Sequence, residues 1–174
     1  VQVIPTANPE ILDLFRRVEI DGAWVPEPWA ARLIVEGGGE LFLDERALWP
    51  DADFTTALVI VRTEFLEEHP DLVQRWLEAH AALTMWEQAN PDEAKLLANE
   101  EIGRLTSQAL SQEVLDSAWS RMSVTYDPLT DTIVASAQAA YMAGYLETEP
   151  DLGGLVDLAV LNAALAEMGL PALP

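Results

Sequence analysis

Residues 21–33, DGAWVPEPWAARL, place two tryptophans around two prolines where a strand-like run gives way to a helical one. The run AWV favours an extended backbone, and prolines at 26 and 28 prevent a strand from continuing through them. The apolar spacing of WAARLIVE then predicts a helix over 28–36, which GGG at 37–39 ends. The stretch therefore predicts a strand followed directly by a helix, the unit from which α/β folds are built.

The flanking segments repeat this order of strand and helix. VQVIPT at 1–6 and ELFLD at 40–44 are predicted to be short strands, and residues 9–19 carry apolar side chains at helical spacing. TTALVIVR at 55–62, a continuous β-branched run, is the most strand-like stretch of the chain. Because alternating strands and helices are typical of a mainly parallel sheet, this part of the chain predicts an α/β fold.

The remainder of the chain is predicted to be mostly helical. Capping residues or prolines mark the helix starts, and only SVTY at 123–126 is predicted to be a further strand. The predicted helices cover residues 63–68, 70–89, 91–98, 112–122, 128–146 and 156–168. The composition changes near residue 58, so we place a boundary between two parts of the chain there.

Composition excludes several classes of function. The chain of 174 residues carries 9 basic and 30 acidic residues, and its net charge of −21 repels nucleic acid and anionic lipid. It contains no cysteine, which excludes thiolate metal sites, and no apolar run is long enough to cross a bilayer. The same charge repels an anionic ligand at long range, so binding an anion would require local N–H donors and arginines.

Residues suited to catalysis are scarce. His69 is explained as a helix cap, and His80 as a hydrogen-bonded core residue on one helical stripe. Asp21 and Glu27 could act as acid and base, but among 30 acidic residues such a pair carries little information. No glycine-rich phosphate loop is present. We therefore expect no enzyme: no catalytic residue, no metal and no cofactor.

The tryptophans fall into two groups. Trp76, Trp86 and Trp119 lie on or beside apolar helical stripes, which predicts that they pack in the core. Trp24 and Trp29 instead flank the proline-rich corner, where a flat ring with an N–H donor could form one wall of a ligand site. The N–H groups at the start of the following helix could bind an anionic head group. The alternative is a corner buried beneath another part of the protein.

Four segments of the chain carry a family resemblance. They are VQVIPTANPEILDLFRRVEIDGAWVPEPWAARL at 1–33, TTALVIVRTEFLEEHPDLVQRWLEAH at 55–80, VTYDPLTDTIVASAQAAYMAGYL at 124–146 and DLGGLVDLAVLNAALAEMGLP at 151–171. In this order they resemble the C-terminal half of the substrate-binding proteins of the bacterial nitrate/sulfonate/taurine import family, which serve ATP-driven ABC transporters. The ordered set, which spans nearly the whole chain, carries the resemblance.

The resemblance implies a periplasmic-binding-protein type II-like α/β fold, in which two lobes close over a ligand, with a mostly helical C-terminal part. Residues 1–57 would form the remainder of the second lobe, and residues 58–174 the hinge-crossing strand and the helices of the first lobe. The implied protein is periplasmic or extracellular, with or without a lipid anchor. Its partners would be a small-molecule nutrient and the transporter permease. Exposed sheet edges in a partial fold would favour self-association.

The matched motifs also imply the ligand-binding positions. These are Trp24, Glu27, Trp29, Thr55, Thr56, Tyr126 and Asp127. Trp24 would stack on an apolar part of the ligand, and Thr56 would form a hydrogen bond with it. Glu27 either holds the loop or selects a cationic amine, since a carboxylate near a helix start competes with an anionic head group.

The ligand that the resemblance implies is a small organic anion such as a sulfonate, nitrate or a taurine-like molecule. A binder of an amine or vitamin precursor on the same fold is one alternative. An interaction module without a small ligand is the other.

Overall fold

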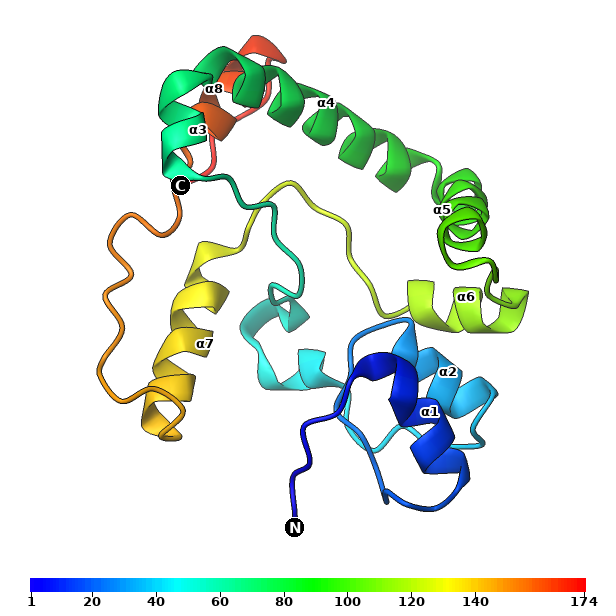
Figure 1. The fold of residues 1–174 in the computed structure, drawn as a ribbon. Coiled ribbons are helices and arrows are strands. Elements are labelled where there is room, and N and C mark those ends of the chain that lie inside the picture. Colours follow the sequence, from blue (N-terminus) through cyan, green and yellow to red (C-terminus); the bar gives the residue numbers. More distant parts are fainter. The chain divides into compact units, whose positions relative to one another are not determined.

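The computed structural model describes all 174 residues and contains eight α-helices, two short 3-10 helices and no β-strand (Figure 1). The α-helices are α1 (Asn8–Arg16), α2 (Trp29–Val35), α3 (Thr63–Glu68), α4 (Pro70–Ala89), α5 (Pro91–Thr106), α6 (Gln112–Trp119), α7 (Thr130–Met142) and α8 (Ala159–Glu167). The 3-10 helices are η1 (Glu45–Leu48) and η2 (Pro50–Ala52). None of the helices combines the length and the apolar composition that crossing a bilayer requires.

The chain forms two compact units, each assembled from two separate segments. Unit 1 comprises residues 1–45 and 90–123, and unit 2 comprises residues 46–89 and 124–174. Unit 1 therefore contains α1, α2, α5 and α6, whereas unit 2 contains α3, α4, α7 and α8.

The helices of unit 1 meet in two small apolar clusters. Ile11 and Leu12 of α1 pack against Leu33 of α2, and Ala31 of α2 packs against Val114 and Ala118 of α6. The glycine run that follows α2 belongs to this packing, because a Cβ atom added at Gly37 would lie 2.6 Å from the Leu33 carbonyl oxygen. The predicted end of the helix at these glycines is thus confirmed, and the reason is steric.

Polar side chains of α5 contact both α6 and the segment that precedes it. The Asn99 side chain donates to the Leu110 carbonyl oxygen at 3.0 Å and accepts from the Leu110 N–H at 2.8 Å. Lys95 Nζ lies 2.8 Å from a carboxylate oxygen of Asp116, and this contact lowers the pKa of the Asp116 carboxyl. Ser111 caps α6 as predicted, since its hydroxyl accepts the Val114 N–H.

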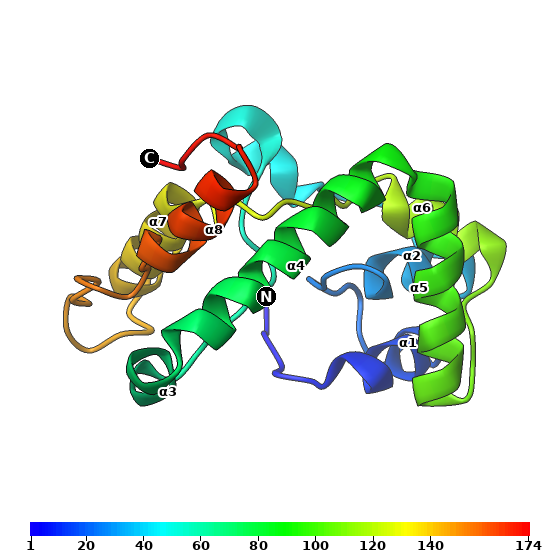
Figure 2. The same ribbon diagram turned by 90° about the horizontal axis from the view of Figure 1, so that it is seen from above.

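In unit 2, α8 packs along α4 (Figure 2). Ala81 of α4 contacts Leu161 and Leu165 of α8, and Tyr126 packs against this cluster. The Asn162 side chain pairs with the backbone of Leu173, donating to its carbonyl oxygen at 3.1 Å and accepting its N–H at 2.8 Å. This pairing holds the C-terminal segment against the helix that precedes it.

The predicted strands do not form in this structure. Segments 1–6, 23–25, 40–44, 55–62 and 123–126 contain no ladder. Ile60, in the most strand-like run, is 89% exposed. A strand requires a neighbour that pairs with its N–H and C=O groups, and a β-branched sequence supplies only the preference, not the partner. The α/β architecture is therefore not present in these two units, which are helical.

The helix predictions are more accurate than the strand predictions. The bounds predicted for α3 and α4 are confirmed, whereas α5 continues to Thr106, well beyond the predicted end at residue 98. The core assignment of Trp76 is wrong, because its side chain is half exposed and stacks on the ring of His80, with 5.2 Å between ring centroids. His80 is only partly buried, whereas two residues of its predicted stripe do face the core, since Thr84 is buried and Leu77 packs against the α4–α8 cluster.

The Asn162 pairing predicts a local effect. We expect Asn162→Ala to speed hydrogen exchange at the Leu173 amide by about tenfold or more, because a side chain–backbone hydrogen bond contributes roughly 1 kcal/mol and two are lost. Amide exchange followed by NMR measures this. Asn99→Ala is the matched control, since it should free the Leu110 amide and leave Leu173 protected. Unchanged protection of Leu173 in Asn162→Ala would contradict the pairing.

Candidate functional site

The corner between residues 24 and 29 presents one tryptophan ring to solvent. Trp24 is 70% exposed, and its indole N–H donates to a carboxylate oxygen of Glu45 at 2.6 Å. The hydrogen bond orients the ring without covering it. An exposed, oriented indole is suited to packing against an apolar part of a ligand.

Glu27 anchors this corner to the helices of unit 1. One carboxylate oxygen accepts the Ala31 N–H in the first turn of α2 at 3.0 Å, and the other accepts Nε of Arg121 at 2.5 Å. Arg121 also donates to the Ser117 hydroxyl at 3.1 Å. Only 9% of the Glu27 side chain and 17% of the Arg121 side chain are exposed. Both carboxylate oxygens are engaged inside the unit, so Glu27 holds the loop.

Trp29, at the start of α2, lines an open pocket of about 670 Å³ that lies wholly within unit 1. Apolar groups from α2, α5 and the loop before α6 form much of its wall: Pro28, Trp29, Ile102, Ala109 and Leu110. Arg32 also lines the pocket, and its guanidinium carbon lies 5.2 Å from the centroid of the Trp29 ring. The pocket therefore combines apolar walls with a cationic group.

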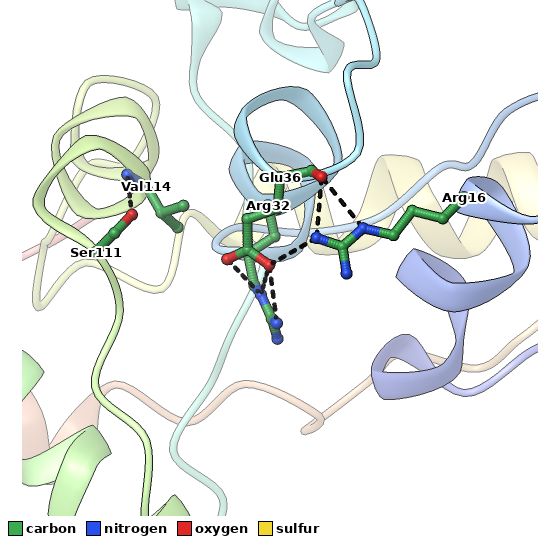
Figure 3. Close-up of polar contacts among 5 residues, drawn as sticks. All are labelled: Arg16, Arg32, Glu36, Ser111 and Val114. Atoms are coloured by element: carbon green, nitrogen blue, oxygen red, sulfur yellow. Dashed lines mark hydrogen bonds and ion pairs between the residues drawn. The ribbon is translucent and has the colours of Figure 1, made fainter.

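Two arginines surround one carboxylate beside this pocket (Figure 3). Arg32 donates through Nε and Nη2 to the Glu36 carboxylate at 3.1–3.3 Å, an i,i+4 pair on α2. Arg16 of α1 donates to the Glu36 backbone carbonyl at 3.1 and 2.9 Å, and its Nη2 lies 3.9 Å from the carboxylate. The group of three carries one net positive charge in a chain whose total charge is −21.

In unit 2 the structure brings Thr55 to the turn that precedes α7. The Thr55 hydroxyl donates to the Pro128 carbonyl oxygen at 2.5 Å, and its N–H donates to the Thr132 hydroxyl at 3.1 Å. Asp127 caps the turn by accepting the Leu129 N–H at 2.9 Å. Tyr126, the preceding residue, packs against the α4–α8 cluster, whereas Thr56 is exposed.

The predicted ligand positions thus form two groups. Trp24, Glu27 and Trp29 share one corner of unit 1. The others gather around one turn of unit 2, where they are Thr55, Thr56, Tyr126 and Asp127. No buried side-chain nitrogen or oxygen lacks a hydrogen-bond partner, and no group of three acidic or histidine side chains could hold a metal ion.

Three arginines, in and beside the corner, are not among the residues predicted from the sequence. Arg121 is 94 positions from Glu27, so no local spacing points to their contact. Arg32 could have been found from its i,i+4 spacing to Glu36, which is a common helical ion pair. Arg16 reaches the same glutamate from α1, a contact that only the packing of α1 on α2 reveals.

The Glu27–Arg121 pair predicts a stability effect. We expect Arg121→Met to lower the free energy of unfolding by about 2–4 kcal/mol, because it leaves a nearly buried carboxylate without its counter-ion. Urea unfolding followed by tryptophan fluorescence measures the change. Arg104→Met, which removes an arginine from an exposed pair with Glu101, is the control and should change stability little. Equal effects of the two substitutions would contradict the anchoring role.

Two comparisons with known proteins indicate the same family. Residues 1–101 match the model of the NMT1-like family. A protein of Bacillus subtilis (strain 168), named "Putative aliphatic sulfonates-binding protein", is 22% identical over 171 residues, which cover 96% of this chain and 49% of that protein. This chain therefore spans about half the length of that relative. No solved structure matches. The resemblance read from the sequence is confirmed: the chain belongs to the NMT1-like family, among the substrate-binding proteins of the nitrate/sulfonate/taurine group.

Proposed function

We propose that this chain serves as a solute-binding component of an ABC importer and captures a small organic anion such as a sulfonate. The observation that carries the proposal is the Trp24 ring, which is exposed and oriented on a corner that Glu27 and Arg121 anchor. An enzyme fits the residues less well, because neither the corner in unit 1 nor the turn in unit 2 contains a histidine or a paired acid and base.

The ligand is held, in this proposal, by closure of two lobes. By the resemblance, the Trp24 corner would supply one wall, Thr55 and Thr56 would lie at the hinge, and Tyr126 and Asp127 would belong to the other lobe. The lobes would divide near residues 57 and 58. Because the chain spans about half of its relative, we propose that strand-like segments such as 55–62 find pairing partners only in a complete type II-like α/β lobe.

The proposed partners follow from this role. They are a small-molecule nutrient and the permease of the transporter, and the protein would work outside the cytoplasmic membrane, with or without a lipid anchor. Self-association is a further proposal for the chain studied by itself, because Phe42 and Ile60 are almost fully exposed.

Specific features of the structure argue against two alternative functions. A ligand with a cationic amine would need a free carboxylate at the corner, but both oxygens of Glu27 are engaged with Ala31 and Arg121. An interaction module without a small ligand would not need an open pocket beside Trp29.

Calorimetry with methanesulfonate, nitrate, taurine, a simple amine and a pyrimidine vitamin precursor tests the proposal. We expect the chain to bind methanesulfonate, and Trp24→Ala to weaken binding by about tenfold, since an aromatic contact contributes about 1 kcal/mol or more. Trp76→Ala is the matched control, because Trp76 is also exposed but lies in unit 2 outside the proposed site. Absence of binding to every compound would contradict the proposal and favour the interaction module.

The salt dependence of that binding tests its electrostatic basis. With a net charge of −21, the protein does not attract an anion from a distance, so affinity must come from local donors. We expect the dissociation constant for methanesulfonate to stay the same or rise as salt is removed, because the repulsion by the acidic surface is screened less at low salt. Binding that tightened steeply as salt was removed would reveal long-range attraction and contradict this account.

A further inference from the structure

We propose that the pocket beside Trp29 is a binding site for an aromatic carboxylate or sulfonate, with Arg32 binding the anionic group and the apolar wall binding the ring. The inference goes beyond the proposed function, because this pocket lies entirely within unit 1 and requires neither lobe closure nor the Thr55 turn. Apart from Trp29, none of its residues is among the ligand positions implied by the sequence.

The volume of the pocket argues for a ligand with a ring. At about 670 Å³ the open pocket lies in the range of pockets that hold drug-sized molecules. Nitrate or methanesulfonate would leave most of the apolar wall in contact with water. A ring, in contrast, would cover the side chains of Trp29, Ile102 and Leu110 and remove them from solvent.

The shape of the wall also favours a flat group. Trp29 presents a planar indole, and the Arg32 guanidinium lies over that ring, 5.2 Å from its centroid, so the pocket wall already contains a stack of two planar groups. Aromatic rings gain additional stabilisation by stacking on such planes, beyond the area that they bury.

Arg32 still has donors to offer an anion. Its contacts with Glu36 use Nε and Nη2 (Figure 3). Its hydrogen bonds do not involve Nη1. The Glu36 carboxylate would repel an anion if it faced Arg32 alone, but Arg16 shares it. Arg32 and Glu36 both line the pocket, and Arg16 contacts Glu36 from α1, so the three groups carry one net positive charge beside a wall that also contains the polar residues Thr106, Gln108 and Ser111. Such a local charge binds an anion that the rest of the protein repels.

Calorimetry with benzenesulfonate, compared with methanesulfonate, tests the inference. We expect benzenesulfonate to bind more tightly by at least about tenfold, from the apolar area that the ring buries. Arg32→Met should weaken benzenesulfonate binding by about tenfold or more, because it removes charge-assisted hydrogen bonds. Arg104→Met, which removes the same charge from α5 outside the pocket, should change it by less than about twofold.

A second pair of variants tests the apolar wall independently of Arg32. Ile102→Glu places a carboxylate inside the pocket and should abolish benzenesulfonate binding, whereas Leu105→Glu places the same charge on an exposed position of the same helix and should not. Circular dichroism establishes that each variant is folded. The inference is overturned if benzenesulfonate does not bind, binds no better than methanesulfonate, or binds equally well to Arg32→Met.

The outcome is distinguishable from failure of the proposed function. Loss of methanesulfonate binding in Trp24→Ala, with no benzenesulfonate binding, would support solute capture at the corner and overturn the pocket. Benzenesulfonate binding that depends on Arg32 but not on Trp24 would support the pocket, whatever the small sulfonates do.

Discussion

The nearly buried ion pair between Glu27 and Arg121 is the contact on which the corner of unit 1 depends. It joins a loop near the start of the chain to the end of α6 and at the same time caps the first turn of α2. Removing either partner would leave a charge with little access to water, so the pair fixes one conformation of the corner. The positions of the exposed Trp24 ring and of Trp29 in the pocket wall both depend on this ion pair. Both oxygens of the Glu27 carboxylate thus have partners within unit 1.

Helices could be predicted from the sequence because their signals are local. The bounds of α3 and α4 follow from the His69-Pro70 step, and the start of α6 follows from Ser111. The strand predictions are wrong for a physical reason. The β-branched run 55–62 favours an extended backbone, but a strand forms only where a partner strand pairs with it, and these units contain no such partner. Likewise, helical spacing indicates which side chains of α4 share a face, but it does not reveal that Trp76 is half exposed while Thr84 is buried.

The site was predictable in its residue types and not in its contacts. Sequence reasoning found the tryptophans of the corner because prolines beside aromatic rings are unusual in a core. It could not find Arg121, which is far from Glu27 in the chain, nor the sharing of Glu36 by Arg16 and Arg32. These contacts make the proposed anionic ligand compatible with a net charge of −21, because salt screens long-range repulsion but has much less effect on a guanidinium in direct contact. The net charge therefore reflects the solvent-exposed surface, whereas the arginines near the pocket would provide the local contacts that the proposed anion needs.

The central claim is that the indoles of the corner form a ligand wall, and the indole N–H signals in a nitrogen–proton NMR spectrum test it most directly. The chain has six tryptophans, so each can be assigned and followed separately. On titration with methanesulfonate, the account predicts that the indole signal of Trp24 moves in a saturable way, while those of Trp76 and Trp86 in unit 2 stay in place. A Trp24 signal that stays in place at saturating ligand would contradict it.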